Sequence, residues 1–147
     1  MAFMDKLNAL KEGAMKQYGR LANKTLMEGT MAGLAMVTNA NGEVKPEEMA
    51  MVIGVISRDQ DLSVYDVTEM TKVFTERMEG FKLSPIMGEA ECLSVISKLK
   101  GKTEQGTLLI GKCCAIGAAD GDFDDNEKAV VKKMCDALAI SPAQFDL

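Results

Sequence analysis

Two related acidic turns, 79 positions apart, constrain the fold of this 147-residue chain more than any other feature. The first contains Asn41-Gly42 and the second contains Asp120-Gly121, and at the same offset Glu48 corresponds to Glu127. Segments with the spacing of amphipathic helices flank both turns. A unit of helix, acidic turn and helix that occurs twice predicts a helical bundle with approximate internal two-fold symmetry.

The composition also favours an all-α fold, because the chain has 12 methionines and only 3 prolines. We expect one domain, residues 1–147, in which a basic amphipathic helix (1–22) precedes an acidic bundle (23–147). The seven expected helices and a short final turn have these bounds: 1–22, 24–40, 46–57, 63–79, 85–100, 103–119, 124–138 and Ser141-Pro142 onward.

Several residues indicate helix boundaries. Gly42 can adopt the left-handed conformation that ends a helix, and Pro46 suits a first helical turn. Ser63 is a candidate N-cap of the fourth helix. Gly80 is expected to end that helix, because glycine is a poor helix former.

Apolar residues with helical spacing predict which faces are buried. In the segment 85–100 these residues are Ile86, Ala90, Leu93 and Ile96. Gly29 and Gly33 are typical of close helix packing, since a phosphate-binding loop would continue with Lys and Ser or Thr. Most methionines fall on such stripes, so we interpret them as core residues.

The first segment differs in charge from the rest of the chain. Residues 1–24 carry a net charge of +3, and the remainder carries −8. The apolar positions of this segment have helical spacing: Phe3, Leu7, Leu10, Ala14 and Leu21. Gly13 and Gly19 weaken the helix. Two interpretations remain open, a helix that packs on the bundle and a helix that rests on an anionic membrane.

The charge and the apolar runs also exclude some classes of protein. An acidic body argues against nucleic acid as a partner. No apolar run is long enough to span a bilayer, and the charges of Asp5 and Lys6 are not typical of a signal peptide. We therefore expect a cytoplasmic protein.

The second turn concentrates negative charge: Asp120, Asp122, Asp124, Asp125 and Glu127 lie within eight positions. Asp124 and Glu127 have the spacing of a capping box, which needs no metal. Asp120 follows a helix C-terminus, where a carboxylate is unfavourable by about 0.3–1 kcal/mol. Oxygen-bound Ca²⁺ or Mg²⁺ would offset this repulsion. Capping alone and capping combined with cation binding both remain open.

This turn does not match an EF-hand. Counting from Asp120, the sixth position should be glycine but is Asp125, and the twelfth should be glutamate but is Val131. The acidic spacing therefore lacks both the sharp turn and the bidentate ligand of that motif.

The first turn is a weaker candidate for cation binding. Asn41 stands where an acid leads the second turn, and Lys45 stands at the position of Asp124. Glu43 and Glu48 remain as carboxylates. We interpret this segment as a capped turn that lends oxygens of Glu48 or Asn41 to a shared site.

Enzymatic chemistry has little support in the sequence. Because the chain contains no histidine, Ser–His and Cys–His nucleophiles are absent and a structural zinc site is disfavoured. The four cysteines have no Cys-x-x-Cys spacing, and we interpret them as small buried apolar residues: Cys92, Cys113, Cys114 and Cys135. A thiol-dependent reductase remains the enzymatic alternative.

The segment 118–128, Ala-Ala-Asp-Gly-Asp-Phe-Asp-Asp-Asn-Glu-Lys, and the ending Ser141–Leu147 resemble the TerB family of tellurite resistance proteins. The segments Met1–Lys6 and Asn23–Thr30 are similar too, so the likeness spans essentially the whole chain. The resemblance implies an all-α cytoplasmic protein of tellurite resistance and stress response, without known catalysis. It also implies acidic surfaces that bind divalent metal ions, and assembly with other tellurite resistance proteins, including a membrane component, at the inner face of the membrane.

We therefore predict a non-enzymatic protein of tellurite or chemical-stress resistance that binds a divalent cation, with Ca²⁺ or Mg²⁺ favoured, and acts as a scaffold. The expected metal ligands are Asp120, Asp122, Asp124, Glu127, Glu48, Glu43 and Asn41. Asn41 departs from the aspartate expected by the resemblance. The competing hypothesis is a metal-independent interaction module whose acidic face binds a basic partner. Peripheral membrane contact would use residues 1–22.

Overall fold

The computed structural model describes residues 24–42, 44–59, 62–119 and 123–147. Within these ranges the chain is all-α and has no strand, which confirms the predicted fold class. The elements are α2 (Lys24–Thr38), α3 (Pro46–Ser57), α4 (Val67–Leu83), α5 (Pro85–Ser97), α6 (Thr103–Ala118), α7 (Asp125–Leu138) and the 3-10 turn η1 (Pro142–Phe145). The helix expected at 1–22 lies outside the described residues.

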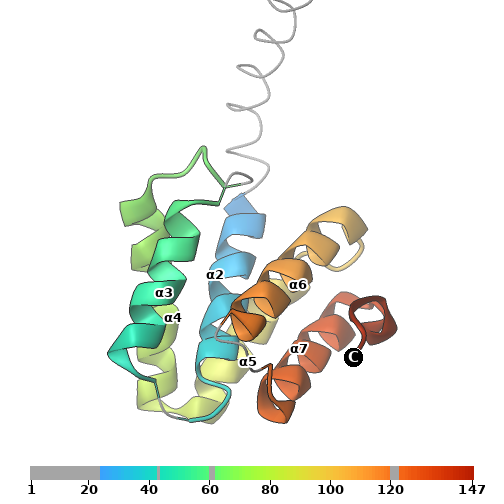
Figure 1. Cartoon of the computed structure of the whole chain (residues 1–147). Coiled ribbons are helices and arrows are strands. Elements are labelled where there is room, and N and C mark those ends of the chain that lie inside the picture. The colour runs from blue at the N-terminus through green and yellow to red at the C-terminus, as the bar shows by residue number, and fades with distance from the viewer. Residues whose placement is uncertain (1–23, 43, 60–61, 120–122) are drawn as a thin grey trace, which may run out of the picture.

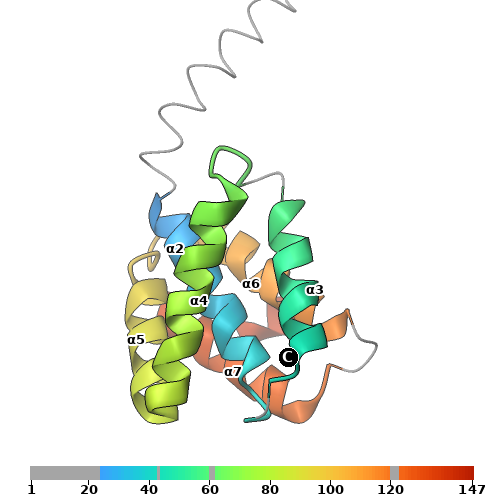
Figure 2. The ribbon, with the colours of Figure 1, turned by 90° about the vertical axis from the view of Figure 1, so that its left-hand side faces the viewer.

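Helix α2 lies at the centre of the bundle, in contact with each of the other five helices (Figures 1 and 2). From Leu26 to Thr38 every residue except Glu28 is buried. The predicted close packing at the paired glycines is confirmed: a Cβ on Gly33 would lie 2.8 Å from Sγ of Cys113 in α6. Small residues on α2 therefore let its neighbours approach closely.

Two predicted boundaries of α4 are wrong. The N-cap is Asp66, whose side chain accepts a hydrogen bond from the N–H of Thr68 at 3.0 Å, and Ser63 is exposed in the preceding turn. Gly80 does not end the helix, which continues to Leu83. The burial of Phe81 outweighs the poor helix propensity of one glycine, about 1 kcal/mol.

The predicted buried face of α5 is also wrong at its first turn. Ile86 and Ala90 are exposed, and the buried residues are Gly88, Cys92 and Ile96. The physical reason is Gly88: a Cβ there would lie 2.8 Å from the backbone nitrogen of Phe81. The face of α5 that can approach α4 this closely is the one with no side chain, so the larger residues of the first turn point outward.

One end of the bundle, which we call the acidic end, gathers the connections that follow α2, α4 and α6 (Figure 1). Its described acids are Glu47, Glu48, Glu79, Glu89, Asp124, Asp125 and Glu127, and its described bases are Lys45, Lys82, Lys128 and Lys133. The opposite end, where α2 begins, carries Lys24, Arg58, Lys98, Lys100 and Lys102 against Asp59, Asp66 and Glu104. The described residues of both turns of the sequence repeat therefore lie at the acidic end.

Candidate functional site: the paired acidic turns

The start of α7 is the capping box that the sequence predicts. The Asp124 side chain accepts a hydrogen bond from the N–H of Glu127 at 2.8 Å, and Oε1 of Glu127 accepts one from the N–H of Asp124 at 3.2 Å. The Glu127 side chain is turned inward, leaving the residue only 8% exposed. The two carboxylates thus satisfy backbone donors at the helix start that would otherwise be unpaired.

The first turn reaches α3 by a different route. Gly42 has a φ of +76°, which confirms the predicted left-handed residue. Pro46 occupies the first helical turn, as predicted, but the N-cap residue Lys45 makes no side-chain capping bond. A lysine side chain has no hydrogen-bond acceptor, so Lys45 cannot cap the backbone N–H groups at the start of α3. The carboxylates of Glu47 and Glu48 complement the dipole of the first turn instead.

The two turns are bonded to each other. Nδ2 of Asn41 donates a hydrogen bond to Oδ2 of Asp124 at 2.9 Å, and Nδ2 of Asn126 donates one to Oδ1 of Asn41 at 2.9 Å. An ionised aspartate only accepts, so the amide of Asn41 must direct its NH₂ toward Asp124 and its oxygen toward Asn126. Asn41 therefore connects the two copies of the repeat.

A small cavity of about 40 Å³ lies beside this connection, between α2, α3, α6 and α7. Asn41, Glu48 and Glu127 line its polar side, and Val52 and Ile116 line its apolar side. This volume suits one water molecule or one small ion. The structure thus brings four of the predicted ligands to one place: Asn41, Glu48, Asp124 and Glu127.

The other three predicted ligands, Glu43, Asp120 and Asp122, lie outside the described residues. Within the described part of the chain, no group of three or more His, Cys, Asp and Glu side chains is placed to hold a metal ion. The donors that do meet are all oxygens, which is the ligand type that Ca²⁺ and Mg²⁺ prefer. The donor chemistry of these residues fits such a cation.

Hydrogen bonding sets the electrostatics of Asp124. The pKa of this carboxyl group is lowered, chiefly by the backbone N–H of Glu127 and next by the side chain of Asn41, because both donors stabilise the ionised form. Sequence reasoning missed Asn126. Nothing in the sequence marks this residue, since its bond to Asn41 joins positions 85 residues apart.

The four cysteines are free thiols. Cys92, Cys113 and Cys135 are buried, which confirms for these three the prediction of small buried apolar residues. Cys114 is partly exposed. Burial raises the pKa of Cys92 to about 12 and that of Cys135 to about 11, and it raises the pKa of Cys113 and of Cys114. Thiols held in the protonated form are poor nucleophiles.

None of the helices in the described residues combines the length and the apolar character needed to cross a membrane.

Comparison with known proteins adds a family to this geometry. The family model described as "Tellurite resistance protein TerB" matches residues 27–147. A curated "Tellurium resistance protein TerB" from Alcaligenes sp is 32% identical over 119 residues, which cover 77% of this chain and 98% of the relative. No solved structure matches the chain significantly.

Proposed function

The chain belongs to the TerB family of tellurite resistance proteins, and we propose that it binds a divalent cation where its two acidic turns meet. The observation that carries the proposal is the bond between the turns, from Asn41 to Asp124 at 2.9 Å. It places oxygens of both copies of the repeat around one small cavity. In this proposal the bound ion joins the two halves of the bundle and stabilises a surface for partner proteins.

The electrostatics of the acidic end support this proposal. Glu48, Asp124 and Glu127 are like charges gathered around the junction, and Asp120 and Asp122 follow directly after the C-terminal residues of α6 in the sequence. Carboxylates at a helix C-terminus are repelled by its carbonyl groups. A divalent cation would convert these repulsions into attractions. We propose that Asp120 and Asp122 complete the oxygen ligand set.

A second candidate function is supported by a separate observation. The capping box and the amide of Asn41 already provide hydrogen bonds to Asp124 without any cation. A metal-independent module would use the same acidic end to bind a basic protein surface. The two candidates differ in whether a cation is needed for the turns to hold their geometry.

We further propose that the protein is not an enzyme and that it works in the cytoplasm with other tellurite resistance proteins, including one at the inner face of the membrane. The lack of histidine and the raised pKa values of the thiols support a non-catalytic role. The family's role in tellurite resistance supports a shared pathway.

Calorimetric titration of the full chain with Ca²⁺, Mg²⁺, Mn²⁺ and Zn²⁺ tests the proposal. We expect heat of binding for at least one ion, and we expect Glu48→Gln and Asp120→Asn each to weaken it, because each removes one charged ligand. Glu104→Gln is the matched control: Glu104 also lies in a first helical turn, but at the other end of the bundle. Its loss should leave the heat unchanged.

The outcomes separate the two candidates. Heat that disappears in the turn variants and persists in Glu104→Gln supports the cation site. If no ion produces heat, or if all three variants behave alike, the cation proposal fails and the metal-independent module stands. Cellular tellurite survival of the same variants then shows whether the ion matters for resistance.

A further inference from the structure

An apolar corner projects from the acidic end where α4 meets α5. Leu83 is 89% exposed, Ile86 is 83% exposed and Met87 is 60% exposed. Exposed apolar residues that cluster in this way are typical of a contact surface. The outward position of Ile86 and Met87 results from the close approach of Gly88 to Phe81, which turns the first residues of α5 outward.

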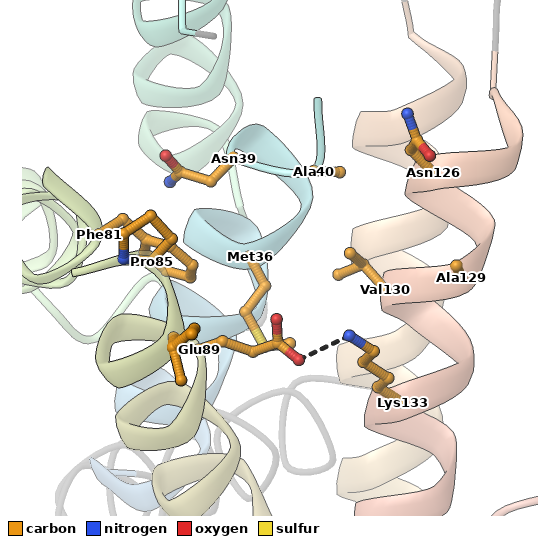
Figure 3. A pocket seen from close by; sticks show the side chains of 11 residues that line it. Met36, Asn39, Ala40, Phe81, Pro85, Glu89, Asn126, Ala129, Val130 and Lys133 are labelled. Atoms are coloured by element: carbon orange, nitrogen blue, oxygen red, sulfur yellow. Dashed lines mark hydrogen bonds and ion pairs between the residues drawn. The ribbon is translucent and has the colours of Figure 1, made fainter. Parts of the chain in front are cut away.

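The corner stands beside a groove rather than on a flat surface. One pocket, of about 290 Å³, lies between α5 and α7 with Met36 and Val130 among its lining residues (Figure 3). A second, of about 620 Å³, lies between α3 and α4 with Met49 and Met78 among its lining residues. The two pockets share three lining residues: Asn39, Phe81 and Pro85. We call these two adjoining pockets together the corner groove.

The charged side chains that line the corner groove are paired with each other. Lys133 is paired with Glu89 at 2.8 Å across the first pocket (Figure 3), and Lys82 is paired with Glu79 at 3.2 Å beside the second. The groove walls therefore carry no net charge of their own. The other carboxylates of the acidic end, such as Glu47 and Asp125, outnumber its other lysines and would attract positive charge.

We propose that the corner groove binds residues 1–22 of the same chain as a basic amphipathic helix. These residues lie outside the described part of the chain, and their sequence supplies the required chemistry. Phe3, Leu7, Leu10 and Ala14 follow one helical stripe, and residues 1–22 carry a net charge of +2. An amphipathic helix that places its apolar stripe in a groove is a common mode of recognition.

The length of the segment fits this placement. Helix α2 has 15 residues and so spans about 22 Å between the end where it begins and the acidic end. If the chain reverses at Gly19, Leu7 and Phe3 lie about 18 and 24 Å along a returning helix. Leu7 and Phe3 lie near the start of the segment, so in this arrangement they would lie level with the groove along the axis of α2.

A membrane is the other surface that a basic amphipathic helix could cover. The apolar corner itself is not expected to insert into an anionic membrane, because an anionic membrane repels the carboxylates of the acidic end around it. Binding the segment in the groove satisfies both the apolar corner and the excess negative charge. Vesicles therefore belong in the experiment as a separate arm.

Tryptophan fluorescence of the full chain tests the proposal. The chain has no tryptophan, so Phe3→Trp creates a single reporter at the far end of the segment. We expect emission at shorter wavelength than in the urea-unfolded chain, together with protection from acrylamide quenching. Adding Ile86→Gln should remove both signals, because it replaces an apolar contact with a neutral polar side chain.

Val55→Gln is the matched control, since Val55 is also an exposed apolar residue, 41% exposed, but on α3 near its far end. It should leave the emission unchanged. Leu83→Gln is a second variant, in the apolar corner beside the groove, in case Ile86→Gln lowers the unfolding temperature. Emission that is unchanged in both variants overturns the proposal. An emission shift that grows with protein concentration also overturns it, because it would indicate binding to a second copy. So does an emission shift that occurs only when anionic vesicles are present.

Discussion

Asn41 and Asp124, 83 positions apart, are joined by a hydrogen bond of 2.9 Å that connects the two acidic turns. The bond requires an amide at position 41, because the ionised carboxylate of Asp124 can only accept. An aspartate at position 41 would bring two carboxylates together with no proton between them. Asn41 therefore provides the direct contact between the two copies of the repeat.

Asn41→Asp should make the fold depend on divalent cations. Without them, we expect the unfolding temperature to fall by a few degrees, because a hydrogen bond is replaced by a repulsion between like charges. If the protein binds a divalent cation as proposed, we expect the variant to bind it more tightly and to recover the lost stability. Thermal unfolding in EDTA and in excess cation measures both effects. Asn41→Ala, which loses the bond without adding charge, should show the loss and no recovery.

The stability of the protein should fall in acid as Asp124 is protonated. The folded state lowers the pKa of this group below its ordinary value of 3.8, so the hydrogen bonds to its carboxylate contribute fully above that pH and are lost as the pH falls through the folded pKa. Asp124→Asn can keep the helix cap but cannot titrate. In urea unfolding with EDTA, the difference between wild type and variant should be constant above pH 4 and shrink below it. A constant difference down to pH 2.5 would contradict the assignment.

Gly88→Ala should destabilise the fold by about 1–3 kcal/mol, because the new methyl group would overlap the backbone of Phe81. Gly54→Ala is its matched control. Gly54 lies in α3, where nothing stands within 4 Å of an added Cβ, so this change should stabilise the protein by about 0.5–1 kcal/mol. Urea denaturation of both variants measures the difference. Equal effects at the two sites would show that α4 and α5 do not pack as described.

The four thiols should react slowly in the native protein. With a pKa of about 12 for Cys92, roughly one molecule in ten thousand carries the thiolate at pH 8. We expect Cys114 to react first with a disulfide reagent, because it is the partly exposed one. All four should react rapidly in urea. A variant with all four cysteines replaced by alanine tests whether the thiols are needed for resistance. If this variant stays folded but its strain loses tellurite resistance, the result supports a thiol-dependent reductase.

Local features of the chain could be predicted well. The capping box of Asp124 and Glu127, the start of α5 at Ser84-Pro85 and the left-handed Gly42 depend on hydrogen bonds and backbone preferences within a few residues. The predicted start of α4 was wrong because Ser63 and Asp66 are both good caps. The burial of Tyr65 between them, and of Leu62 just before Ser63, decides in favour of Asp66.

The sequence by itself determined that this protein is a helical bundle with two acidic turns, because helix periodicity, caps and charge density are properties of neighbouring residues. Only the tertiary structure decided that Asn41 meets Asp124 and Asn126, since that contact needs two helix ends to be brought together by packing elsewhere. It also decided that Ile86 faces outward, because the approach of α5 to α4 is set by the absence of a side chain at Gly88 and not by the apolar pattern.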